Sequence, residues 1–137
     1  MRIEWVTTCR YAESHPGLGA TLVGVGVDTT ETTFPSTIDL WIAVYMAANH
    51  HEVGSDVVHH LTYTVQGPDM TDRDSDTLRF LLTEPTPGHR PGWDLHHLEA
   101  LHIEFPVSEA GPHTISVALD SQVAKCAVLY VRDELRE

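Results

Sequence analysis

Histidine is the residue type in this sequence whose abundance points most directly to metal chemistry. The chain carries ten histidines in 137 residues, and neutral imidazole nitrogens bind zinc, nickel and copper. Three adjacent pairs occur, His50-His51, His59-His60 and His96-His97. Neighbours on a β-strand point to opposite faces of the sheet, so a pair within a strand, such as His59-His60, offers only one imidazole to a given site.

One spacing places an imidazole and a carboxylate on the same face of a strand. This is His102-x-Glu104, because side chains two residues apart in a strand share a face. Adding His97 or His60 from a neighbouring strand would complete a three-ligand site for a divalent transition metal. The alternative is that these histidines are solvated or lie at the edge of the core.

A second candidate is an acidic segment that begins like a calcium loop, Asp72-x-Asp74-x-Asp76. A calcium loop also needs glycine at its sixth position and a bidentate glutamate at its twelfth. Those positions hold Thr77 and Thr83. Weak calcium binding therefore stays an alternative to an aspartate-rich turn that joins two strands.

The sequence contains no motif for nucleophilic catalysis. No Gly-x-Ser-x-Gly segment occurs, and the residues around Cys9 and Cys126 do not mark a catalytic thiol. We expect both cysteines to be small, buried, unpaired packing residues. The sequence therefore predicts no enzyme, no catalytic residue and no cofactor.

The tryptophans divide between core and surface. Trp5 and Trp41 lie within apolar stretches, which predicts that both pack in the core. Trp93 follows the segment 84–92, which holds three prolines and two glycines and is expected to form an exposed loop. Trp93, together with Arg90 of that loop, is the sequence's candidate for contact with a binding partner.

The charge excludes two classes of partner. Eight basic residues against twenty acidic ones give a net charge of −12, whereas nucleic acids and anionic membranes are bound by clustered positive charge. The longest apolar run is 40–48, about half of a membrane-spanning helix. Because residues 1–5 do not resemble a secretory signal, we expect a cytoplasmic protein. We expect its partner to be another protein, and self-association into a homo-oligomer stays open.

Composition and periodicity predict an all-β fold. Valine, threonine and isoleucine make up 34 of the 137 residues, and apolar residues alternate with polar ones between turn-forming segments. We predict one domain over 1–137, an immunoglobulin-like β-sandwich of about seven to eight mostly antiparallel strands. A helical turn over 94–101 stays an alternative to the sixth strand. The predicted strands are 2–11, 19–28, 37–47, 57–66, 77–84, 95–105, 112–120 and 123–132.

Several short motifs, taken in order, resemble a family of uncharacterised bacterial proteins. The first strand ends in Cys9-x-Tyr11-Ala12, and 67–69, 91–93 and the strand from Gly111 to Asp120 follow at similar places. The resemblance implies an immunoglobulin-like β-sandwich in a bacterial, cytoplasmic protein, and it implies no activity. The sequence thus favours a non-enzymatic module that binds another protein; the alternative is a metal-binding protein or metal-dependent enzyme that uses the His/Glu site.

Overall fold

The computed structural model describes residues 1–15, 19–54, 56–82, 92, 94–122 and 125–134, and almost all of its regular structure is β. A single turn of 3-10 helix, η1 (His50–Glu52), is capped by the side chain of Asn49. The strands are β1 (Arg2–Cys9), β2 (Tyr11–His15), β3 (Gly19–Val23), β4 (Thr29–Thr32), β5 (Ser36–Ala48), β6 (Val58–Gln66), β7 (Asp72–Leu81), β8 (Leu95–Val107), β9 (Gly111–Leu119) and β10 (Lys125–Asp133).

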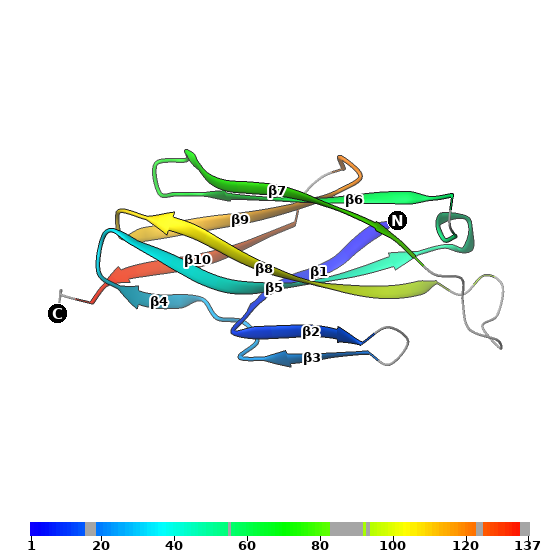
Figure 1. Ribbon diagram of the computed structural model, residues 1–137, viewed down its shortest axis with the longest axis horizontal. Coiled ribbons are helices and arrows are strands. Elements are labelled where there is room, and N and C mark those ends of the chain that lie inside the picture. The colour runs from blue at the N-terminus through cyan, green and yellow to red at the C-terminus, as the bar shows by residue number, and fades with distance from the viewer. Residues whose placement is uncertain (16–18, 55, 83–91, 93, 123–124, 135–137) are drawn as a thin grey trace.

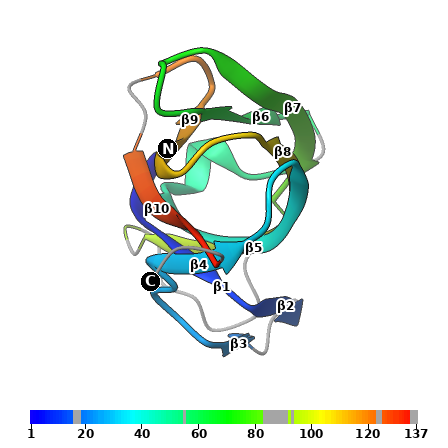
Figure 2. The same cartoon turned by 90° about the vertical axis from the view of Figure 1, so that its left-hand side faces the viewer.

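Two sheets face each other and form a β-sandwich, which confirms the all-β prediction. One sheet has the order β1-β5-β8, and the other has the order β4-β10-β9-β6-β7 (Figure 1). All pairs in these sheets are antiparallel except β4 with β10, which is parallel. Viewed end-on, the two sheets wrap around one interior (Figure 2). The immunoglobulin-like assignment stays a prediction.

Alternation of apolar side chains builds the core between the two sheets. In β9, Ile115, Val117 and Leu119 are buried, while the residues between them are partly exposed. This is the pattern of a strand with one face toward the core, as the sequence predicted. The other large contributors are Ile38, Leu40, Ile42, Val44, Met46, Leu61, Val65, Ile103, Phe105, Val107, Leu129 and Val131.

The hairpin β2–β3 forms a separate small layer on the outer face of the three-stranded sheet (Figures 1 and 2). Its inward side chains, Ala12 and Leu22, pack with Cys9 and Ala43 in a second apolar cluster. The outer face of β5 is therefore partly covered, which explains why this strand is apolar on both faces.

Two predicted strands end earlier in the structure than the sequence predicted. The predicted strand 2–11 breaks at Arg10, because β1 pairs with β5 and β2 pairs with β3. The predicted strand 19–28 ends at Val23, since Gly24 and Gly26 turn the chain with φ angles of +65° and +79°. After these two breaks the chain forms β2 and β4, which the sequence did not predict, and the number of strands is ten rather than eight.

Two other local predictions are wrong. Strand β7 begins at Asp72 rather than at residue 77, so the acidic segment lies in a strand instead of a turn. Strand β7 is paired only with β6 in its sheet, and edge strands tolerate charged residues. The helical alternative over 94–101 fails because these residues pair with β5. No helix in the described ranges has the length and apolar character to span a membrane.

Candidate functional site

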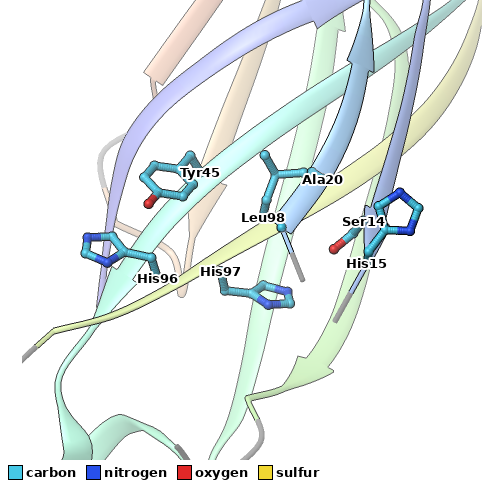
Figure 3. A pocket seen from close by; sticks show the side chains of 8 residues that line it. Ser14, His15, Ala20, Tyr45, His96, His97 and Leu98 are labelled. Carbon is cyan, nitrogen blue, oxygen red and sulfur yellow. The ribbon is translucent and has the colours of Figure 1, made fainter. Parts of the chain in front are cut away.

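A hollow of about 360 Å³ lies between the β2–β3 hairpin and the outer face of the three-stranded sheet. Ser14, Gly19 and Ala20 line it from the hairpin, together with His15. Its opposite wall comes from β5 and β8, and Figure 3 shows the side chains from both walls. The wall residues on these two strands are Tyr45, His96, His97 and Leu98.

Two wall residues of the hollow, Tyr45 and His96, are part of a row of three stacked rings. Trp5, Tyr45 and His96 come from the adjacent strands β1, β5 and β8. Trp5 lies opposite Tyr45, and His96 lies diagonally across from Tyr45, two residues before its partner Leu98. The ring centroids are 5.1 Å apart for Trp5 and Tyr45 and 5.3 Å apart for Tyr45 and His96. Because the faces of Tyr45 lie against its neighbours, the row presents ring edges to a ligand rather than a flat platform.

The prediction that Trp5 and Trp41 pack in the core is wrong for Trp5, whereas Trp41 packs against the second apolar cluster beneath the hairpin. Trp5 is 39% exposed on the outer face of the sheet. Trp41 is half-buried on the same face, where Tyr11 of the hairpin contacts its ring in an edge-on geometry at 5.4 Å. The side chains of both tryptophans point to the outer face of the sheet, and the apolar residues next to them in sequence point into the interior.

The pair His102 and Glu104 lies on one face of β8, as their spacing predicted, and Asp39 of β5 joins them. The ligand atoms of these three residues lie within 4.8 Å of one another, and all three side chains are exposed. His102 Nε2 is hydrogen-bonded to Asp39 Oδ1. Spacing alone did not identify Asp39, because its place depends on how β5 pairs with β8.

The two other histidines of the predicted metal site lie elsewhere. His60 is exposed on β6 in the opposite sheet, where it pairs with Arg79. His97 lies on β8 but in the opposite phase from His102. Its Nε2 is 2.6 Å from Glu99 Oε1, and its ring stacks on Phe80 at 5.6 Å.

His59 is a buried histidine that the sequence analysis did not single out. Its Nδ1 lies 2.8 Å from Asp120 Oδ2 and its Nε2 lies 2.7 Å from the carbonyl oxygen of Glu52. The carboxylate of Asp120 and the carbonyl oxygen of Glu52 are both hydrogen-bond acceptors, so each ring nitrogen faces an acceptor. With both nitrogens occupied, His59 ties η1 and the β9–β10 turn to β6 and is not free to act as a base. The signal for it was the His59-His60 pair, of which one member must face the core.

The carboxylate of Asp120 is held in its charged form by the same contacts. It accepts hydrogen bonds from the His59 ring and from the backbone N–H of His60. Burial opposes ionisation here, but these hydrogen bonds and the positive charge of the histidines outweigh it and lower the pKa of Asp120.

The acidic residues of the calcium-like segment have separate partners. Asp72 accepts a hydrogen bond from Gln66, and Asp74 accepts one from the Tyr63 hydroxyl at 2.8 Å. Asp76 accepts one from the backbone N–H of Thr77. The only His, Cys, Asp and Glu cluster of three found within the described ranges is the Asp39 group. Calcium binding by Asp72, Asp74 and Asp76 stays a prediction.

This leaves the two predicted binding residues and the two cysteines. Arg90 and Trp93, the predicted binding residues, lie outside the described residues. Cys9 is buried and Cys126 is exposed, and neither forms a disulfide. The expectation that both thiols are buried is thus wrong for Cys126, which lies on the outward phase of β10.

Comparisons with models of protein families, with curated proteins and with solved structures give no match. The resemblance to uncharacterised bacterial proteins therefore stays a prediction.

Proposed function

We propose that this chain is a non-enzymatic binding module that recognises another protein at the hollow between the β2–β3 hairpin and the three-stranded sheet. The observation that carries the proposal is the hollow itself. It is open to solvent, it has a volume of about 360 Å³, and the edge of the Trp5–Tyr45–His96 row borders it. Aromatic residues beside a concave surface are typical of the centres of protein interfaces.

Charge and ring chemistry define the partner. The net charge of −12 favours the approach of a positively charged surface and raises the rate of encounter. An arginine side chain fits the hollow chemically, since its planar guanidinium packs against aromatic rings and donates hydrogen bonds. Ser14 and the imidazole of His96 offer polar atoms in this hollow. We therefore propose a partner that inserts an arginine there.

Cytoplasmic location, bacterial origin and an immunoglobulin-like topology complete the proposal. The resemblance of the sequence motifs supports all three. The order of the strands in the two facing sheets supports the topology as well.

A pair of hairpin variants tests where the partner binds. Ala20 lies on the side of β3 that lines the hollow, so Ala20→Trp should fill it. Thr21 is the next residue and faces away from the sheet, which makes Thr21→Trp the matched control. The immobilised chain is used to capture proteins from a lysate of the source cells, and bound proteins are quantified by mass spectrometry.

We expect the wild-type chain and Thr21→Trp to recover the same protein in a constant ratio, and Ala20→Trp to lose it at least about tenfold. Circular dichroism checks that all three chains are folded. Equal recovery by Ala20→Trp would move the interface away from the hollow. A folded wild-type chain that captures no protein would contradict the binding function altogether.

A further inference from the structure

We propose that Asp39, His102 and Glu104 form a binding site for a divalent transition-metal ion on the outer face of the β1-β5-β8 sheet. The three side chains come from two neighbouring strands, and their ligand atoms lie within 4.8 Å of one another. The site is separate from the proposed protein-binding hollow, which none of the three residues lines. The two proposals therefore stand or fall independently.

Strand register fixes the three residues in one place. Asp39 of β5 lies directly opposite Glu104 of β8, and Trp41 lies opposite His102. Side chains that are opposite each other or two residues apart share a face of the sheet. The backbones of two long, regularly paired strands thus hold the three ligands in a fixed triangle, without dependence on a loop.

The two carboxylates of this triangle face each other across the strands. Like charges directly opposite each other destabilise an antiparallel pair. Within the described part of the chain, no lysine or arginine forms an ion pair with Asp39 or Glu104. Arg10 lines a hollow of about 120 Å³ together with Asp39, but its stem packs over Gly24. A bound cation would neutralise the facing charges.

The distances suit a small ion after a modest closure. Zinc binds nitrogen and oxygen at about 2.0–2.2 Å in a tetrahedron, which puts neighbouring ligand atoms roughly 3.3–3.5 Å apart. The observed limit of 4.8 Å therefore requires the side chains to close by at most about 1.4 Å. All three are exposed, so rotation about their side-chain bonds can bring this about while the strands stay in place.

The donor set selects the class of ion. One imidazole nitrogen and two carboxylate oxygens suit zinc and its first-row neighbours, whereas calcium and magnesium prefer oxygen alone. Three protein ligands leave at least one position for water or for a further ligand. We therefore infer a labile, solvent-facing site for an ion such as Zn²⁺ or Ni²⁺.

The imidazole is oriented before any ion arrives. The ring of His102 stacks on the indole of Trp41, with ring centroids 4.7 Å apart and planes at 19°. Tyr11 in turn packs edge-on against the Trp41 ring, with the ring centroids 5.4 Å apart. Support of this kind reduces the rotational freedom that a metal-binding histidine must lose. The indole also places a fluorescent reporter beside the site.

Calorimetric titration with ZnCl₂ tests the site in protein purified without an affinity tag. We compare the wild-type chain with His102→Gln and Asp39→Asn. The matched control is His60→Gln, which removes an equally exposed strand histidine from the opposite sheet. A parallel titration with NiCl₂ follows the quenching of tryptophan fluorescence. Circular dichroism confirms that each variant retains the fold.

We expect one saturable zinc site, a dissociation constant at least about tenfold higher in His102→Gln and Asp39→Asn, and no change in His60→Gln. Nickel should quench fluorescence in the wild type and in His60→Gln but lose this effect in His102→Gln. Absence of saturable zinc binding would overturn the proposal. Equal weakening by His60→Gln, or displacement of zinc by equimolar calcium, would overturn it as well.

Discussion

His113 is a histidine that the fold keeps neutral. Its side chain has no exposed surface, and its Nδ1 donates a hydrogen bond to the carbonyl oxygen of Gly111 at 3.1 Å. Its Nε2 has no partner among the described residues, and the ring lies beside Phe105. Burial lowers the pKa of His113, and the positive charge of Arg73 adds to the effect.

The lowered pKa of His113 predicts a loss of stability in acid. Above the ordinary histidine pKa of about 6.5, the ring is neutral in both the folded and the unfolded chain. As the pH falls below this value, the unfolded chain takes up a proton that the folded chain refuses. The free energy of unfolding then drops by up to about 1.36 kcal/mol per pH unit, until the pH reaches the lowered folded pKa.

The variant His113→Phe removes the contribution of His113 to the pH dependence of stability, because phenylalanine does not titrate. Its ring has a similar shape and fits the same site. Urea unfolding measured from pH 7.5 to 5 should show a smaller loss of stability in the variant than in the wild type, with a difference of at most about 1.36 kcal/mol per pH unit below about pH 6.5. His60→Gln serves as the control, since it removes an exposed histidine. An identical pH dependence in wild type and His113→Phe would refute the prediction.

At the scale of residues, the sequence was informative where the signal is local. The spacing of His102 and Glu104 was enough to place both on one face, because that relation depends only on the two-residue period of a strand. Asp39 lies 63 residues away from His102 and joins them through the pairing of β5 with β8, which spacing does not encode. For the same reason the sequence could not choose which of the His59-His60 pair is buried.

At the scale of elements, the β2–β3 hairpin depends on glycines at its exit. Gly24 and Gly26 adopt φ angles of +65° and +79°, a region that strains other residues. The two positions differ in their surroundings. A Cβ on Gly24 would lie 2.8 Å from the side chain of Arg10, whereas a Cβ on Gly26 would meet nothing within 4 Å.

This difference predicts unequal costs for two otherwise similar substitutions. Gly26→Ala should destabilise the fold by roughly 1 kcal/mol, through backbone strain alone. Gly24→Ala adds a clash with Arg10 and should cost roughly 2–3 kcal/mol. Thermal or chemical unfolding of the two variants measures the difference. Equal destabilisation would mean that the Arg10 stem moves aside freely.

The limits of strand prediction are clear at this hairpin. Strands such as β5, β6 and β9 could be predicted to within a residue or two, because alternation and flanking turns mark them. The break at Arg10 has neither glycine nor proline. It arises because β1 and β2 have different partners. Which strand pairs with which is decided by tertiary structure. The same holds for the edge position of β7, which lets a strand accommodate the charged residues Asp72 to Asp76.

At the scale of the whole molecule, net charge governs solubility. Protonation of all ten histidines would take the formal charge from −12 to −2, and buried His113 lags behind the rest. Because self-repulsion keeps acidic proteins apart, we expect solubility to fall below about pH 6. Precipitation by polyethylene glycol across pH 8 to 5 measures this. Unchanged solubility over that range would contradict the expectation.

Strand β10 occupies an interior place in the five-stranded sheet, between β4 and β9, although it follows the other nine strands of the described residues. As long as β10 is still inside the ribosomal exit tunnel, β4 has no neighbour in this sheet and one edge of β9 is unpaired. Unpaired edges of this kind recruit other chains. The moments just before β10 emerges are thus when a nascent copy is most exposed to misassembly with its neighbours on a polysome.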